Sequence, residues 1–86
     1  MAKPLSLSGR ISSIHYDRNY GFISPEDPAR RGEEIFFHKE GVLPKEDGTF
    51  SSMLAGDSVT YEELFTKKGL RAVHVRKQIW ESEEGR

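Results

Sequence analysis

The sequence predicts an all-β fold, a small barrel of five strands. Three observations lead to this prediction: β-branched and aromatic residues gather in five short segments, glycine and proline interrupt the connections, and no long segment has the apolar period of a helix. The chain has 86 residues, enough for one domain with one core. It contains no cysteine, so neither a disulfide framework nor a thiolate zinc site is expected.

The first three expected strands lie in the N-terminal half. Residues 5–16 are rich in Ser, Leu and Ile, and a second strand follows at 19–24. Asp, Arg and Asn at 17–19 predict a tight turn, because Asp and Asn favour turn conformations. Residues 24–34 contain two prolines and no apolar period, which predicts a loop. The third strand, 35–39, is aromatic and β-branched.

A long connection and a hairpin are expected next. Residues 40–56 hold three glycines and one proline, with room for one helical turn. A fourth strand is expected at 57–65, where Val59 and Tyr61 share one face because strand side chains alternate. Thr-Lys-Lys-Gly at 66–69 predicts a hairpin turn, so the last two strands should pair.

The fifth expected strand is 70–78, and its pattern predicts that Val73 and Val75 point inward. Residues 79–86 carry three acidic side chains and one basic side chain, with no strand pattern. We therefore predict one domain over residues 5–78 and a short acidic tail over 79–86.

Charge and hydropathy limit the classes of function. The chain has 13 basic and 14 acidic side chains, and the excess of acid lies in the tail. The composition thus predicts no strong non-specific attraction to duplex DNA, which depends on many Lys and Arg contacts to phosphate. No apolar run has the length of a membrane span, and the N-terminus lacks the apolar stretch of a signal peptide. We expect a cytoplasmic monomer that does not associate with membranes.

Ring-bearing residues recur two positions apart on two neighbouring expected strands. Tyr20 and Phe22 should share one face, and so should Phe36 and His38. The alternate positions supply an inward apolar set that includes Phe37, so the core does not require the other rings. Rings on a sheet with nearby cations hold single-stranded nucleic acid, because every base has a π-face. The pattern therefore predicts a base-stacking surface, with burial of these rings in the core as the alternative.

The same two segments resemble a known family. RNYGFI at 18–23 is similar to K-G-[FY]-G-F-I, and IFFHK at 35–39 is similar to V-F-V-H-F. These are the two ribonucleoprotein motifs of the cold-shock domain, found in bacterial cold-shock proteins and eukaryotic Y-box proteins. Further similarity lies at GRI (9–11), LAGDSVTY (54–61) and KGLRAVHV (68–75), so the resemblance covers roughly residues 8–78.

The resemblance implies a five-stranded antiparallel OB-fold barrel that binds single-stranded RNA or DNA along its first three strands. It implies little sequence readout, a preference for pyrimidines, no cofactor, and a chaperone role that keeps RNA unpaired and so affects transcription or translation. Phe50 would extend the ring surface from the long connection, and the cations would contact phosphates. The nucleic-acid-binding residues implied in this way are Arg18, Tyr20, Phe22, Phe36, His38, Lys39, Phe50 and Lys68.

The sequence also departs from the family pattern. The first strand of the family typically reads V-K-W-F-N, whereas Ser12, Ser13 and Ile14 stand here in place of its lysine, tryptophan and phenylalanine. Lys39 replaces a phenylalanine, and Asn19 replaces a glycine but tolerates a left-handed backbone. Losing two stacking rings would cost about 2–6 kcal/mol of binding if the terms added. We therefore expect a shorter or weaker site, displaced toward the second and third strands.

The sequence leaves the roles of five further residues open. His15 and Tyr16 are candidates for substitute rings, but their placement depends on how the first strand turns. Arg30 and Arg31 either reach a phosphate backbone or lie in a solvated loop. Trp80 either folds back onto the first strand, meets a partner, or belongs to a solvated tail.

Two other classes of function compete with nucleic-acid binding. Catalysis has little support, because the three histidines lack metal-ligand spacing and no phosphate-binding loop motif is present. The stronger rival is a protein-interaction module, an OB barrel whose diminished ring surface docks a protein, with Trp80 and the acidic tail as candidate contacts. The depleted first strand favours this rival, and the rings of the next two strands oppose it. The choice between RNA and DNA stays open.

Overall fold

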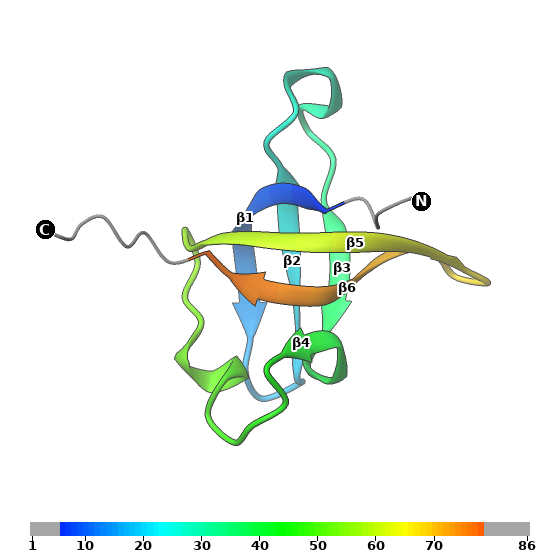
Figure 1. Ribbon diagram of the computed structural model, residues 1–86. Helices are drawn as coiled ribbons and strands as arrows, with labels where there is room; N and C mark the ends of the chain where they lie inside the picture. The colour runs from blue at the N-terminus through cyan, green and yellow to red at the C-terminus, as the bar shows by residue number, and fades with distance from the viewer. Residues whose placement is uncertain (1–5, 79–86) are drawn as a thin grey trace, which may run out of the picture.

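The computed structural model describes residues 6–78 and confirms the all-β barrel. Figure 1 shows β1, β2 and β3 side by side, with the β5–β6 hairpin running across them. The five long strands match the five expected ones within two residues at each end, and a two-residue β4 lies in the long connection. The strands are β1 (Leu7–His15), β2 (Tyr20–Pro25), β3 (Ile35–His38), β4 (Val42–Leu43), β5 (Ser58–Thr66) and β6 (Gly69–Lys77).

The sheet closes on itself. Its strands follow the order β3-β2-β1-β5-β6-β4, and an additional pairing joins β3 to β6. That closing pair is parallel, with Phe36 opposite Arg71 and Phe37 opposite Ala72. Pairs between consecutive long strands are antiparallel. Closure pairs the edges of β3 and β6, which would otherwise be open. It also brings β6 next to the expected ring surface on β3.

The core fills the barrel from every long strand. The predicted inward set is confirmed for Phe37, Val59 and Tyr61, which are each at most 1% exposed. The buried apolar residues are Ile11, Ile23, Ile35, Phe37, Val42, Phe50, Met53, Val59, Tyr61, Ala72 and Val75. Because one face of β2 and β3 fills this core, the side chains between those positions must point outward.

A bulge in β6 changes one predicted orientation. The pairing of β5 with β6 shifts between Thr60 and Glu62, and His74 has a φ of 52°. The extra residue reverses the alternation, so Ala72 is buried at 1% while Val73 is only half-buried. The expectation that Val73 points inward with Val75 was therefore wrong.

The turn between β1 and β2 has the expected left-handed backbone. Asn19 has a φ of 65°, a conformation that asparagine adopts more readily than most residues. The main-chain N–H of Lys39 donates to the Asn19 carbonyl at 2.8 Å, which ties this turn to the end of β3. This contact fixes the end of the sheet where the rings of β2 and β3 lie.

The loop between β2 and β3 is held by ion pairs. It contains a 3₁₀ turn, Pro28–Arg30, capped by the Asp27 carboxylate. The Arg30 guanidinium lies 2.8 Å from Glu33 and 2.7 Å from Glu63 of β5. These carboxylates raise the pKa of Arg30 above its ordinary value. Arg30, a candidate for phosphate contact, is therefore already engaged in ion pairs within the protein. Trp80 and the tail expected at 79–86 lie outside the described residues.

Candidate nucleic-acid interface

Strand register places the outward side chains in two rows across the sheet. In the first row Tyr20 stands opposite His15 on β1 and opposite His38 on β3. In the second row Phe22 stands opposite Ser13 on β1 and opposite Phe36 on β3. Arg71 of β6 continues this second row, because it pairs with Phe36 across the closing parallel pair. The two rows are called the platform below.

The platform rings form one continuous cluster. Tyr20 lies 5.8 Å from Phe22 and 5.5 Å from Phe36 between ring centroids, and Phe22 lies 6.0 Å from Phe36. Each of these rings is half-buried, so one side of each ring supports its neighbours while another faces solvent. Contiguous half-exposed rings of this kind are typical of binding surfaces. The expectation that these three rings lie outside the core is confirmed.

Gly21 lies between Tyr20 and Phe22, where the backbone of β2 packs closely against β1 and the core ring of Phe37. A Cβ at this position would lie 2.7 Å from the Ser13 carbonyl oxygen and 2.8 Å from the Phe37 ring. Only glycine therefore fits between the two rings of the motif without a shift of the core. The rings on either side of Gly21 point outward because Phe37 already fills the space beneath it.

His15 is one of the two candidate substitute rings whose placement the sequence did not determine. Its ring is exposed and lies 4.8 Å from the Tyr20 ring at an interplanar angle of 37°. A bulge in β1 between Ile11 and Ser13 sets this orientation by shifting the alternation of the strand. His15 thus supplies a ring on β1 in the first row, while Ser13 leaves the second row without one.

Tyr16 does not join the platform. Its ring contacts Phe50 at 5.9 Å, and its hydroxyl donates a hydrogen bond to the Met53 carbonyl. These contacts attach the end of β1 to the long connection.

Phe50 occupies a different place from the one expected. Its ring is 5% exposed and packs 6.2 Å from the Phe37 ring, inside the core. The expectation of a solvent-facing ring that extends the platform is corrected, because Phe50 packs into the core against Phe37 and Tyr16 instead. An open cavity of about 380 Å³ lies beside it, between residues 44–51 of the long connection and Lys39.

Arg71 is a platform residue that the sequence did not reveal. Its guanidinium carbon lies 5.3 Å from the Phe36 ring centroid, within the range of a cation–π contact. The side chain reaches the ring across the barrel closure, between strands more than thirty positions apart in the chain. Arg71 brings a positive charge to the end of the second row opposite Ser13.

His38 has a fixed ring orientation at the lower edge of the platform. Its Nδ1 accepts a hydrogen bond from the main-chain N–H of Glu40 at 3.0 Å. In the neutral ring the proton therefore resides on Nε2, which leaves a donor for a ligand. This bond also caps the 3₁₀ turn Lys39–Gly41.

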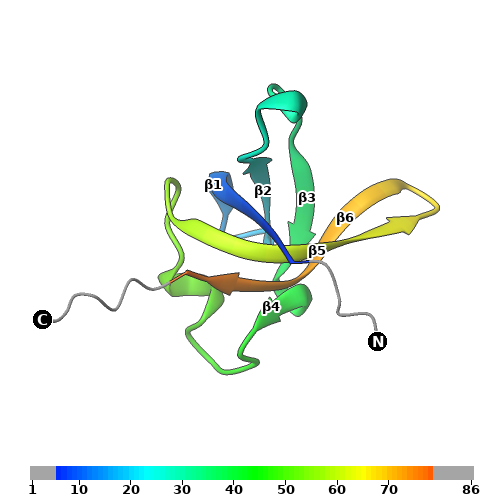
Figure 2. The same cartoon turned by 45° about the horizontal axis from the view of Figure 1, so that its top comes forward.

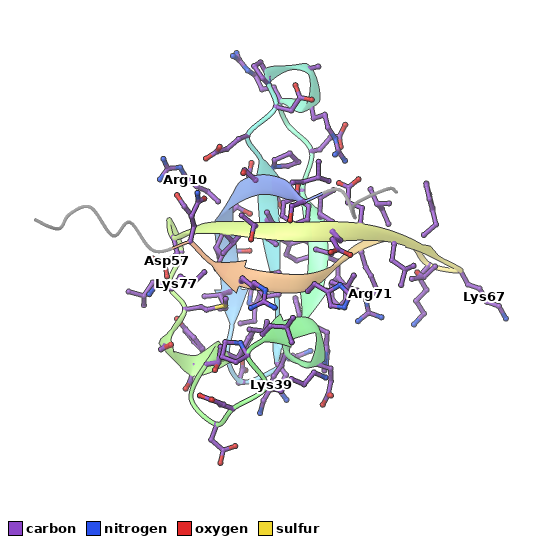
Figure 3. All side chains as sticks on the ribbon, viewed as in Figure 1. Arg10, Lys39, Asp57, Lys67, Arg71 and Lys77 are labelled. Carbon is purple, nitrogen blue, oxygen red and sulfur yellow. The ribbon has the colours of Figure 1, made fainter. Side chains whose placement is uncertain are left out.

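The other predicted cations lie outside the two rows of the platform. Arg18 is exposed in the β1–β2 turn, and Lys39 is exposed directly after β3. Figure 3 shows Lys39 at the lower end of the barrel. Lys68 is exposed in the turn of the β5–β6 hairpin, whose end projects away from the other strands in Figures 1 and 2. The site therefore combines a ring surface with Arg71 at one end and Lys39 directly after His38.

Comparison with known proteins agrees with this geometry. The family described as the 'Cold-shock' DNA-binding domain matches residues 7–78. The chain belongs to the cold-shock domain family. The cold-shock domain is a nucleic-acid-binding domain, which supports the resemblance drawn from the two motifs.

Two relatives of the cold-shock domain are similar over most of their length. Cold shock protein 1 of Lactiplantibacillus plantarum is 31% identical over 68 residues, which is 79% of this chain and 92% of that protein. Cold shock protein 2 of the same organism is 31% identical over 71 residues, which is 83% of this chain and 97% of that protein. Both similarities extend well beyond the ring-bearing segments.

Among solved structures, drosophila Unr CSD456 has the same fold. The TM-score is 0.68 at 20% identity, and the match covers 92% of this chain. The cold-shock domain described here spans 29% of the length of that chain. At this identity the likeness concerns the fold alone.

Residues 6–78 show neither a metal site nor a membrane-spanning helix. Within them, no group of three or more His, Asp or Glu side chains is arranged to hold a metal ion. The same residues contain no helix long and apolar enough to cross a membrane.

Proposed function

We propose that this cold-shock domain binds single-stranded RNA or DNA on its platform. The two rows of half-exposed rings, Tyr20 with its histidine neighbours and Phe22 with Phe36, are the observation that supports this function. Each ring offers a face to one base, and base–aromatic stacking contributes about 1–3 kcal/mol per base. Unpaired bases are needed for such contacts, so a duplex would bind poorly.

The cations around the platform add a salt-dependent contribution. Arg18 and Lys39 lie at its lower edge and Arg71 at the end of the second row, so a strand crossing the rings passes positive charge on more than one side. Contacts between such cations and phosphates release counterions and weaken as salt rises. Because backbone phosphates and π-faces are common to all sequences, this arrangement favours binding with little sequence readout.

The consequence for RNA follows from mass action. A protein that binds the unpaired form and not the duplex shifts the equilibrium toward the unpaired form without consuming ATP. We infer a chaperone role of this kind, with effects on transcription or translation through the folding of RNA. The absence of a ring at Ser13 makes the second row shorter, so we expect weaker binding than that of a domain with a tryptophan there.

An NMR titration of the labelled protein with oligo-dT and oligo-U tests the proposal. Resonance shifts concentrated at Tyr20, Phe22 and Phe36 are expected, at low and at moderate salt. Phe22→Ala and Phe36→Ala should each weaken binding by about 1–3 kcal/mol. Leu54→Ala is the matched control, because Leu54 is also apolar and 59% exposed but lies outside the platform. Equal affinities for all four proteins would contradict the proposed site.

A protein-interaction module remains the second candidate. Ser13 is the observation that favours it, because the second row lacks a ring at the position where the family pattern has a tryptophan. Under this function the platform would dock a protein, and neither oligonucleotide would shift the platform resonances even at millimolar concentration.

A further inference from the structure

A second cavity lies where β6 ends, and it shares no lining residue with the platform. Its volume is about 270 Å³, and its walls come from β4, the long connection and the last residues of β6. Leu43, Pro44 and Met53 supply its apolar lining, and Arg76 and Lys77 of β6 form one side. Apolar surface exposed to water is unfavourable, so a group that covered this lining would gain stability.

The cavity suits one apolar side chain better than a base or a larger ligand. None of the described residues that line it carries an aromatic ring, so it offers no stacking surface to a base. Its volume also lies below the roughly 300–1,000 Å³ of typical ligand pockets. Met53 belongs to the core and is 1% exposed, so a side chain in the cavity would extend the core outward.

The acidic tail begins beside this cavity. The main-chain N–H of Gln78 donates to the Ser58 carbonyl at 2.8 Å, which fixes the end of the described chain against β5. Figure 3 shows Lys77 where β6 ends. Trp80, the only tryptophan of the sequence, follows Lys77 by three positions, so their Cα atoms are at most about 11 Å apart. A tryptophan side chain at that distance can reach the cavity.

Charge also favours the tail as the occupant. Residues 81–84 contain three glutamates and no basic side chain. Arg76 and Lys77 are both exposed at the side of the cavity. Within residues 6–78 Arg76 forms no ion pair, and Lys77 lies 3.4 Å from Asp57. Exposed ion pairs contribute little by themselves, so burial of the ring would supply most of the stabilisation and the charges would direct the tail.

We propose that Trp80 docks into this cavity and anchors the tail across the end of β6. The indole ring covers Leu43 and Met53, and the glutamates that follow it lie beside Arg76. The tail then joins the long connection to the last strand, instead of folding back onto the first strand. This docking does not depend on whether the platform binds nucleic acid.

The tail of a second copy carries the same chemistry, but the chain's own tail has the advantage of its tether. Only three positions separate Trp80 from a residue that lines the cavity. A short linker of this kind gives an effective concentration on the order of millimolar. Trp80 of the same chain should therefore occupy the cavity at micromolar protein concentrations.

Intrinsic fluorescence and NMR of the full chain test the proposal. Because Trp80 is the only tryptophan, the tryptophan emission reports on this residue alone. The emission of the native protein should be blue-shifted relative to the chain unfolded in urea, and acrylamide should quench it less. Nuclear Overhauser effects between the indole protons and the methyl groups of Leu43 and Met53 should place the ring in the cavity.

Two neighbouring serines provide a matched pair of variants. Ser51 and Ser52 are both exposed, and each hydroxyl donates to a main-chain carbonyl three residues before it. Of the two, Ser52 lines this cavity. Ser52→Glu places a carboxylate there, which repels the glutamates of the tail and disfavours an apolar ring. The emission of Ser52→Glu should shift toward that of the unfolded chain, whereas that of Ser51→Glu should stay at the wild-type position.

Four results would overturn the docking of Trp80. The first is native emission and quenching equal to those of the unfolded chain, which would show a solvated ring. The second is a set of Overhauser effects to Ser13 or Phe22, which would place the ring on the first strand or the platform. The third is emission that changes with protein concentration, which would indicate the tail of a second copy. The fourth is an unchanged emission in Ser52→Glu when the NMR spectrum shows that this variant is folded.

Discussion

The gap at Ser13 predicts a gain of function. Ser13 lies on the outward face of β1, directly opposite Phe22, at the end of the row that Phe36 and Arg71 continue. It is half-buried, so a larger side chain at this position can extend along the sheet beside Phe22 instead of entering the core. Ser13→Trp should therefore lengthen the second row by one ring.

The size of the gain follows from the stacking of one base. One additional base–aromatic contact contributes about 1–3 kcal/mol, which corresponds to roughly 5-fold to 150-fold in Kd. The lower part of this range is expected, because His15 in the neighbouring row already offers a ring on β1. Effects of neighbouring rings also do not add fully when the rings contact the same strand.

Fluorescence anisotropy with oligo-dT at fixed salt measures this gain. Ala29→Trp is the matched control, because Ala29 is exposed in the β2–β3 loop and outside the platform. A lower Kd for Ser13→Trp, with no change for Ala29→Trp, is expected. If Ser13→Trp folds normally and binds no better than the wild type, the two rows do not carry the bases, and the assignment of the platform is refuted.

Four further predictions concern stability. Phe50→Ala should lower the free energy of unfolding in urea by about 3–5 kcal/mol, as for a core ring, whereas a platform ring would chiefly change binding. Gly21→Ala should cost about 1–3 kcal/mol in the same assay, because its Cβ would meet backbone and the Phe37 ring; a neutral effect would contradict the tight packing. A double-mutant cycle on Arg30 and Glu63 should give a coupling of about 1 kcal/mol, and zero coupling would show that the pair does not hold the loop. Burial raises the pKa of Tyr61, so unfolded chains lose this proton first and stability should fall as pH rises above 10, less so in Tyr61→Phe.

The alternation of side chains made the ring surface predictable. Tyr20, Phe22 and Phe36 lie where a period of two places them, because β2 and β3 pair in regular register through these residues. The buried position of Phe37 followed from the same period. Turn residues were equally informative, since Asn19 adopts the left-handed backbone that its residue type allows. Local rules are sufficient wherever the strand is regular.

Bulges removed that regularity in two places. The shift in β1 brings His15 beside Tyr20, and the shift at His74 buries Ala72 in place of Val73. A bulge depends on how a strand pairs with its neighbours, and no single segment of sequence records it. The positions after a bulge therefore could not be assigned from alternation alone.

Long-range contacts decided the rest. Phe50 was expected on the platform because of its place in the motif pattern, but the packing of the long connection against Phe37 and Tyr16 takes it into the core. Arg71 reaches Phe36 only because the barrel closes β3 against β6. The sequence by itself determined the fold class and the rings of two strands, since these depend on local alternation and turn chemistry, and the resemblance of two motifs indicated the family. Only the tertiary structure decided which cation completes the second row and which ring of the long connection joins the core. The first depends on closure of the sheet, and the second on packing of the long connection against Phe37.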